Sequence, residues 1–222
     1  MANVDDLVKR LQRLDVCAVS DAMDKLGLPP SVSGLTQQST QQRIAGKVVT
    51  YKLVPAAQVP AQTGAPRHLG TTAIEAAEPG DVIVIEQRTG LDAGSWGGIL
   101  SLAAKLRQVA GVVVDGPVRD IDEARAYEFP VYARGLTART ARARVAEAFT
   151  NQPVRIGEVT VCPGDYVIAD ASGAVFIAAA DIERVLKAAE MIVGREAAMA
   201  QALRAGQPVS QVMGADYEHM LK

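Results

Sequence analysis

Cysteine is scarce in this chain of 222 residues. The two cysteines, Cys17 and Cys162, are far apart and stand outside any spacing typical of a metal site. They exclude a disulfide framework and favour a reducing compartment, so we expect a cytoplasmic protein. Because free cysteine is usually buried, each thiol is predicted to be an inert core side chain.

The sequence also lacks a basic excess, long apolar runs and aromatic residues. Lysine and arginine number 23 against 25 acidic residues, so nothing indicates a surface for nucleic acid. No apolar run reaches membrane-spanning length, and residues 5–10 carry charges where a signal peptide needs an apolar core. We therefore expect neither export nor membrane insertion. Aromatic residues make up 4% of the chain, which predicts a core of Val, Ile, Leu and Ala.

No internal repeat, low-complexity tract or linker interrupts the chain, so residues 1–222 are predicted to form one domain. Apolar residues recur at helical spacing near both ends, which predicts N-terminal helices within about 4–26 and a C-terminal helix at about 181–206. Ser20 and Asp21 are interpreted as the N-cap of the second helix. The C-terminal helix has a wide apolar face, which needs cover from another surface.

Apolar strands alternate with helices in the middle of the chain. The expected strands begin at 45, 82, 111 and 131, and the expected helices lie at 71–77, 98–106 and 121–127. Strands joined by helices run parallel with right-handed crossovers. Four short strands between 154 and 177 predict an antiparallel meander that forms a second β layer. The predicted fold class is α/β, a single-domain sandwich with a mostly parallel layer, a second β layer and peripheral helices.

Two polar segments are harder to interpret. Residues 55–70 are predicted to be a long loop, in which His68 is favoured as a surface residue over a catalytic base. Residues 137–151 contain Arg139, Arg142 and Arg144, which are offset by acidic residues. We interpret this segment as a solvated face or a subunit contact.

The most informative stretch runs from residue 94 to residue 120. A glycine-rich loop leads into an apolar-periodic helix, whose first N–H groups lack intrahelical partners and attract anions. A buried-type strand follows and ends in a Gly-Pro turn, which delivers Arg119 and Asp120 side by side. Arginine binds carboxylates and enolates, and aspartate oxygens suit Mg²⁺. Together they predict a site for a small, oxygen-rich acid, although packing explains the loop alone and helix capping explains Asp120 alone.

These residues carry a resemblance to a known family. Segments 94–100, 114–120 and 129–135 resemble the family that joins 4-hydroxy-4-methyl-2-oxoglutarate aldolases to the RraA-like regulators of ribonuclease activity. The similarity covers most of the chain, and Asp-Gly-Pro-Val-Arg-Asp at 115–120 is its most specific part. It implies the swivelling α/β/β sandwich of the RraA-like family, commonly a homotrimer or a hexamer built from two trimers.

The resemblance also implies a function. It indicates a class II aldolase, dependent on Mg²⁺ or Mn²⁺, that cleaves a 4-hydroxy-2-oxo acid to pyruvate through an enolate, often with oxaloacetate decarboxylase activity. Asp120 then binds the metal, and Arg119 holds the ketone or enolate oxygen of the 2-oxo acid. The pyruvyl carboxylate is received by the backbone N–H groups of Gly97, Gly98, Ile99 and Leu100.

Other interpretations stay open. A non-catalytic regulator that binds and inhibits a ribonuclease would use the same fold through surface patches. A methyltransferase is disfavoured, because the glycine loop lacks the later acidic residue that a nucleotide ribose needs. Lys105 is disfavoured as a Schiff-base nucleophile because nothing indicates a buried setting. Contributions to the site from Glu86, Asp92 and Trp96 are left undecided, as is acidic support by Glu196 of a neighbouring subunit, which the resemblance implies.

Overall fold

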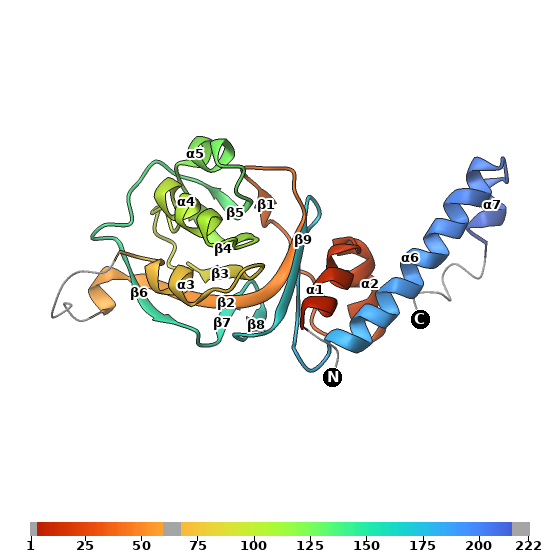
Figure 1. Ribbon diagram of the computed structural model, residues 1–222, viewed down its shortest axis with the longest axis horizontal. Coiled ribbons are helices and arrows are strands. Elements are labelled where there is room, and N and C mark those ends of the chain that lie inside the picture. Colours follow the sequence, from red (N-terminus) through yellow and green to blue (C-terminus); the bar gives the residue numbers. More distant parts are fainter. Residues whose placement is uncertain (1–3, 60–67, 215–222) are drawn as a thin grey trace.

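The computed structural model describes residues 4–59 and 68–214, and it shows a strongly curved sheet with helices packed outside it (Figure 1). The helices are α1 (Val4–Gln12), α2 (Val16–Lys25), the 3-10 helix η1 (Ala56–Gln58), α3 (Thr71–Ala76), α4 (Gly98–Leu106), α5 (Ile121–Ala126), α6 (Ile182–Arg204) and α7 (Val209–Val212). The strands are β1 (Thr36–Gln37), β2 (Ile44–Pro55), β3 (Val82–Glu86), β4 (Gly111–Val118), β5 (Val131–Leu136), β6 (Val145–Thr150), β7 (Val154–Ile156), β8 (Val159–Val161), β9 (Tyr166–Asp170) and β10 (Gly173–Ile177).

The main sheet is mixed and nearly closed. Its strand order is β1-β5-β4-β3-β2-β9-β10, and β6 also pairs with β2. The run from β5 to β2 is parallel, as predicted for strands joined by helices, and the other pairs are antiparallel. Val32, just before β1, exchanges two backbone hydrogen bonds of 2.8 and 3.2 Å with Ala174 of β10. The two ends of the sheet therefore meet.

Side chains of the parallel strands alternate between the two faces of this sheet. On β3, Val82 and Val84 face the enclosed interior, whereas Ile83 and Ile85 face the layer of α3, α4 and α5. Both faces are covered, which explains why the parallel strands are continuous apolar runs in the sequence. A third apolar cluster joins α1, α2 and α6 to β9 and β10. The α/β fold class predicted from the sequence is confirmed.

The second β layer is smaller than expected. Only β7 and β8 form it, as a two-stranded antiparallel sheet that packs apolar side chains into the interior of the main sheet. The prediction of one four-stranded meander is wrong, because β9 pairs with β2 over Ile44–Lys47 and carries β10 into the main sheet. Strand β2 is long enough to pair with β9 at one end and β6 at the other.

Several local expectations also need correction. Helix α2 begins earlier than predicted, because the side chain of Asp15 caps it by accepting the N–H of Ala18 at 2.9 Å. Ser20 and Asp21 therefore lie inside the helix and do not cap it. Both cysteines are exposed, not buried. Cys17 lies on the outer side of α2, and Cys162 lies in the turn that follows β8.

Two strands differ from the pattern that the sequence suggests. Residues 116 and 117 do not form a turn, because β4 continues to Val118 with a shift in register between Val114 and Pro117. The segment at 137–151, interpreted as a solvated face, contains strand β6. This strand is only partly buried, so its sequence lacks the regular apolar alternation that would have predicted it.

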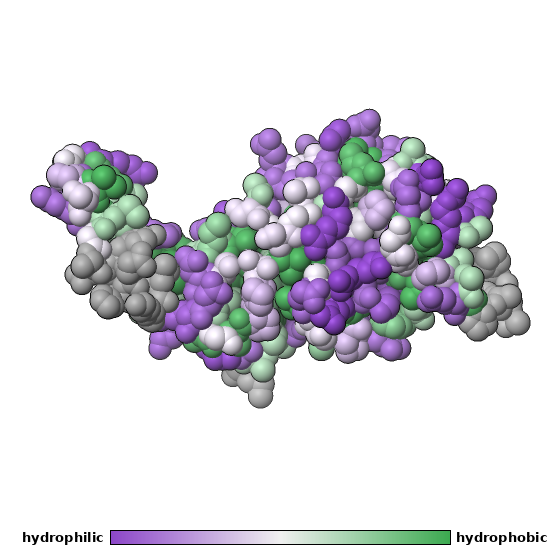
Figure 2. Space-filling model, turned by 180° about the vertical axis from the view of Figure 1, so that it is seen from behind, coloured by the Kyte–Doolittle hydropathy of each residue, from purple (hydrophilic) through white to green (hydrophobic). Residues whose placement is uncertain are grey.

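Helix α6 is covered over only part of its length. Its buried residues end at Ile192, and they pack against α1 and α2. The remaining turns lead away from the body and end beside α7, so they form a projection in Figures 1 and 2. Figure 2 shows polar and apolar side chains interspersed along it. Among the described helices, none is both long enough and apolar enough to cross a membrane.

Candidate active site

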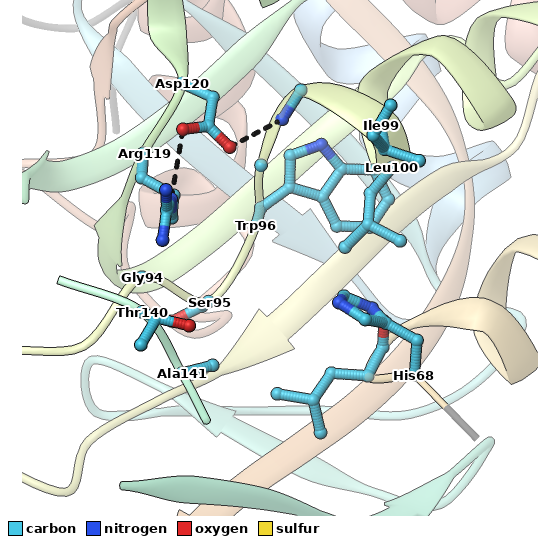
Figure 3. A pocket seen from close by; sticks show the side chains of 13 residues that line it. His68, Gly94, Ser95, Trp96, Ile99, Leu100, Arg119, Asp120, Thr140 and Ala141 are labelled. Carbon is cyan, nitrogen blue, oxygen red and sulfur yellow. Dashed lines mark hydrogen bonds and ion pairs between the residues drawn. The ribbon is translucent and has the colours of Figure 1, made fainter. Parts of the chain in front are cut away.

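A cavity of about 160 Å³ opens where the parallel strands end (Figure 3). The loops that follow β3, β4 and β5 line it, together with the segment between β2 and α3. The carboxyl ends of parallel strands meet at one edge of a sheet, which is where α/β proteins generally bind ligands. Its lining residues include His68, Gly94, Trp96, the stretch from Gly97 to Leu100, Arg119, Asp120 and Thr140.

Arg119 reaches this cavity because two chain segments are joined by backbone hydrogen bonds. The N–H of Arg119 donates to Trp96 O at 3.0 Å, and the N–H of Ser95 donates to Pro117 O at 2.9 Å. A Cβ atom on Gly94 would lie 2.8 Å from Arg119 Cγ, so only glycine leaves room for the arginine stem. Within the described ranges, the Nη atoms of Arg119 have no hydrogen-bond partner.

Asp120 has an unusual backbone and side chain. Its φ of 54° and ψ of 41° lie in the left-handed region, where a non-glycine residue costs about 1 kcal/mol or more and often marks a functional site. It occupies the N-cap position of α5 without capping the helix. Its Oδ1 accepts Arg119 Nε at 3.0 Å, and its Oδ2 accepts the N–H of Gly98 at 3.2 Å. The carboxylate is thus directed to the cavity.

The four residues expected to receive a carboxylate all line the cavity. They form the first turn of α4, whose backbone N–H groups carry the positive end of the helix dipole. The N–H of Gly98 is already engaged by Asp120. Across the part of the chain that the structure describes, the N–H groups of Ile99 and Leu100 have no hydrogen-bond partner. These two donors are available to an anion.

Trp96 forms a fixed wall of the cavity. Its indole Nε1–H donates to Ser101 Oγ at 2.9 Å, and its ring centroid lies 6.2 Å from that of Phe129. Ser101 Oγ in turn donates to Gly97 O at 3.0 Å, which ties the wall to the first turn of α4. The neighbouring hydroxyl of Ser95 is buried and, within the described residues, lacks a partner.

Glu123 is a candidate site residue that the sequence analysis missed. A Cβ atom on Gly98 would lie 1.5 Å from Glu123 Oε2, so this carboxylate covers Gly98 close to Asp120. Glu123 and Asp120 also line a second, open cavity of about 420 Å³ on the outer side of the same loop. The sequence could have indicated it, because Asp120 and Glu123 are three residues apart at a helix start, and such residues share one face of the helix.

The carboxylates of Asp120 and Glu123 are compatible with a magnesium-type ion. Among the described residues, no three acidic, histidine or cysteine side chains are grouped as a metal cluster. Mg²⁺ nevertheless binds through one or two carboxylates and keeps several waters. The Asp120 side chain is 32% exposed, which leaves room for such waters.

Two acidic residues that the sequence left undecided lie elsewhere. Side chains of β3 alternate between the two faces, so Glu86 points into the interior with Val82 and Val84. There it pairs with Lys52 Nζ at 2.7 Å and accepts the N–H of Arg155 at 2.7 Å. It therefore fastens β7 and does not line the cavity. Asp92 is exposed and pairs with Arg139 at 3.2 Å.

Two further candidates also lie outside the cavity. Lys105 is exposed and donates to Glu128 O at 3.1 Å, so it lacks the buried setting that a Schiff-base lysine needs. Glu196 lies on α6, where burial and the charges of Asp15 and Asp21 raise its pKa.

The fold is α/β, and its small cavity brings together Arg119, Asp120 and two helix N–H groups that have no partner among the described residues. A family model described as RraA-like (Aldolase/RraA) matches residues 16–176. The chain belongs to this RraA-like family.

The individual relatives described next share between 25% and 29% of their residues with this chain. A protein of Halalkalibacterium halodurans named "Putative 4-hydroxy-4-methyl-2-oxoglutarate aldolase" is 29% identical over 83% of this chain and 82% of its own length. Protein DlpA of Legionella pneumophila is 28% identical over 78% of this chain, but the chain spans only 27% of that longer relative. The crystal structure of RraAS2 from Streptomyces coelicolor, titled an unusual member of the RNase ES inhibitor RraA protein family, has a TM-score of 0.75 and 25% identity. The matched region covers 88% of this chain and 96% of the RraAS2 chain.

Proposed function

We propose that this protein is a divalent-metal-dependent lyase that cleaves 4-hydroxy-2-oxo acids, such as 4-hydroxy-4-methyl-2-oxoglutarate, and releases pyruvate. One observation carries the proposal: Arg119, Asp120 and the free N–H groups of α4 line the same small cavity. Aldol cleavage and oxaloacetate decarboxylation both leave negative charge on the C2 oxygen of pyruvate. The same cavity would therefore support both reactions.

The protein groups have separate roles in this proposal. The N–H groups of Ile99 and Leu100 bind the pyruvyl carboxylate at the positive end of α4. The Nη atoms of Arg119 stabilise the growing charge on the C2 oxygen, as a preorganised cation does in oxyanion stabilisation. The Nε of Arg119 is held by Asp120, which orients the guanidinium. Trp96 restricts the space for water beside the reacting carbon atoms.

Asp120, with Glu123 beside it, would hold Mg²⁺ or Mn²⁺. When bound, such an ion supplies Lewis-acid polarisation of the 2-oxo group. The names of the relatives support a lyase, and the donor set of two carboxylates supports a hard divalent ion.

The experiment follows pyruvate release from oxaloacetate and from 4-hydroxy-4-methyl-2-oxoglutarate by EDTA-treated protein, with and without added Mg²⁺ or Mn²⁺. We expect metal to restore release in the wild-type protein but not in Asp120→Asn, which keeps the shape of the side chain. Asp122→Asn is the matched control, since Asp122 is exposed and pairs only with Arg125 at 2.8 Å among the described residues. Release that survives both EDTA treatment and Asp120→Asn would contradict the proposal.

We also propose that the protein assembles as a homotrimer or as a hexamer of two trimers. The uncovered half of α6 and the exposed Ile99, Leu106 and Leu136 give apolar surface that further copies of the chain would cover. Light scattering coupled to size exclusion tests this, and a monomer at micromolar concentration would contradict it.

A further inference from the structure

His68 lines the same cavity as Arg119 and Asp120. Figure 3 shows Arg119 and Asp120 on one side of the cavity and the imidazole of His68 on the other. The sequence favoured a surface position, and His68 is indeed exposed. It is nevertheless the only imidazole-bearing residue among the described ranges, and it lies at the mouth of the proposed site.

The backbone around His68 is well fixed. His68 O accepts Thr71 Oγ1 at 2.8 Å and the N–H of Thr71 at 3.3 Å, which forms the turn into α3. The N–H of Gly70 donates to Glu147 Oε2 at 3.1 Å. A Cβ atom on Gly70 would lie within 3.5 Å of both Leu100 and Trp96, so the turn packs directly against the cavity wall.

A hydrogen bond sets the tautomer of the ring. Nδ1 lies 3.0 Å from Leu69 O, and a carbonyl oxygen only accepts. Nδ1 must therefore carry the hydrogen in this contact, and in the neutral imidazole Nε2 then has a free lone pair. This arrangement leaves Nε2 as a proton acceptor.

Aldol cleavage needs such an acceptor, and the other titratable groups lining the cavity are unsuitable. Arginine stays protonated in proteins. Both oxygens of Asp120 accept hydrogen bonds, from Arg119 and from Gly98. Glu147, the charged group that faces the turn from β6, is engaged by Gly70 and Thr150. A neutral imidazole accepts a proton at one nitrogen while the other nitrogen keeps its hydrogen, so it can act first as base and then as acid.

We propose that His68 is the general base and acid of the cleavage reaction, an inference that rests on the proposed lyase function. Nε2 removes the proton of the 4-hydroxyl group as the C3–C4 bond breaks. The C4 carbon becomes a carbonyl, and the electron pair of the broken bond forms the enolate of pyruvate. The imidazolium then returns the same proton to C3, which yields pyruvate and requires no other reactant.

Decarboxylation of oxaloacetate provides an internal control, because a carboxylate leaves as carbon dioxide without prior removal of a hydroxyl proton. His68 then holds no proton from the substrate, and a water molecule protonates C3 of the enolate. In His68→Gln we expect kcat for aldol cleavage to fall about 10²- to 10⁴-fold, as is typical for loss of an acid–base group. Oxaloacetate decarboxylation should change less than about threefold on the same principle. Added imidazole should partly restore cleavage in His68→Gly.

Three results would overturn the role of His68. These are cleavage by His68→Gln at the wild-type rate, an equal loss of both activities, and absence of rescue by imidazole. Failure of the wild-type protein to release pyruvate from either substrate contradicts the proposed function instead. A separate measurement then decides the place of His68: ¹⁵N NMR of the histidine rings during titration with oxalate, an analogue of the pyruvate enolate.

The NMR assignment is simple because the chain has only two histidines, and His68→Gln identifies the signal that belongs to residue 68. We expect the Nε2 resonance of His68 to shift when oxalate binds. An unchanged resonance under saturating oxalate would show that the imidazole does not face the ligand, and it would overturn the inference whatever the activity.

Discussion

The carboxylate of Glu123 occupies the space that a side chain on Gly98 would require, since a Cβ atom there would lie 1.5 Å from Glu123 Oε2. Gly98→Ala should therefore displace this carboxylate from its place beside Asp120. We expect the affinity for Mn²⁺ to fall about tenfold or more, because the displaced carboxylate no longer lies beside Asp120. Isothermal titration with Mn²⁺ measures the loss.

Glu123→Gln tests whether Gly98→Ala lowers the Mn²⁺ affinity by displacing the Glu123 carboxylate. If Gly98→Ala acts by displacing Glu123, the double variant should bind Mn²⁺ no more weakly than either single variant, because the two changes remove one ligand. Losses that add in full would show that the alanine acts elsewhere.

Arg119 is expected to be the most sensitive cation of the site. Arg119→Ala should lower kcat/KM for pyruvate release by about 10²- to 10³-fold, the effect of removing one oxyanion donor. Arg119→Lys should restore little, because lysine cannot bond Asp120 through Nε and reach the substrate with a second nitrogen. Arg125→Ala, on the exposed side of α5, is the control and should stay near the wild-type rate. Full turnover in Arg119→Ala would exclude this role.

Two serines near Trp96 should respond oppositely to alanine. Ser95 Oγ is buried and has no partner among the described residues, so Ser95→Ala should raise the free energy of unfolding by about 1 kcal/mol. Ser101 Oγ both accepts Trp96 Nε1 and donates to Gly97 O, so Ser101→Ala should lower that free energy by about 1 to 3 kcal/mol. Urea unfolding compares the two, and equal losses would contradict the prediction.

The pair between α1 and α6 should make stability depend on pH. Arg10 donates to both oxygens of Glu190, at 2.7 and 2.8 Å, and these hydrogen bonds lower the pKa of the Glu190 carboxyl from its ordinary 4.5. The folded-state pKa lies below the unfolded value, so the stabilisation is present above pH 4.5 and is lost as the pH falls through the folded value.

Glu190→Gln should therefore destabilise by about 0.5 kcal/mol at neutral pH, a small amount because the pair is partly exposed. The difference in stability from the wild-type protein should vanish once Glu190 is protonated in both the folded and the unfolded state. Urea titrations at several pH values measure this, and a constant difference would mean that the ion pair is not its cause.

The local chemistry of the site could be predicted from the sequence because it depends on neighbouring residues. The loop at 94–98, the helix after it and the pair Arg119-Asp120 all follow from short-range patterns, and the structure brings them to one cavity. The left-handed backbone of Asp120 could not be predicted, because the contacts that hold it involve Gly98 and Arg119 in three dimensions.

Positions that depend on strand register were harder to predict. Glu86 is close to the glycine loop in sequence, yet the alternation of β3 directs it to the opposite face, toward the hairpin of β7 and β8. The separation of that hairpin from β9 and β10 likewise depends on which strands pair with β2, a long-range choice without a local signal. His68 is separated from the glycine loop and from Arg119 by α3 and β3, so its proximity to them also required the fold.

The left-handed conformation of Asp120 has a consequence for engineering. Glycine adopts this conformation without the steric cost, so Asp120→Gly should fold at least as stably as the wild-type protein while it removes the carboxylate. A directed-evolution screen that rewards heat resistance alone would enrich glycine at position 120. Such a library would progressively lose the activity that we propose, and a selection for turnover would have to accompany it.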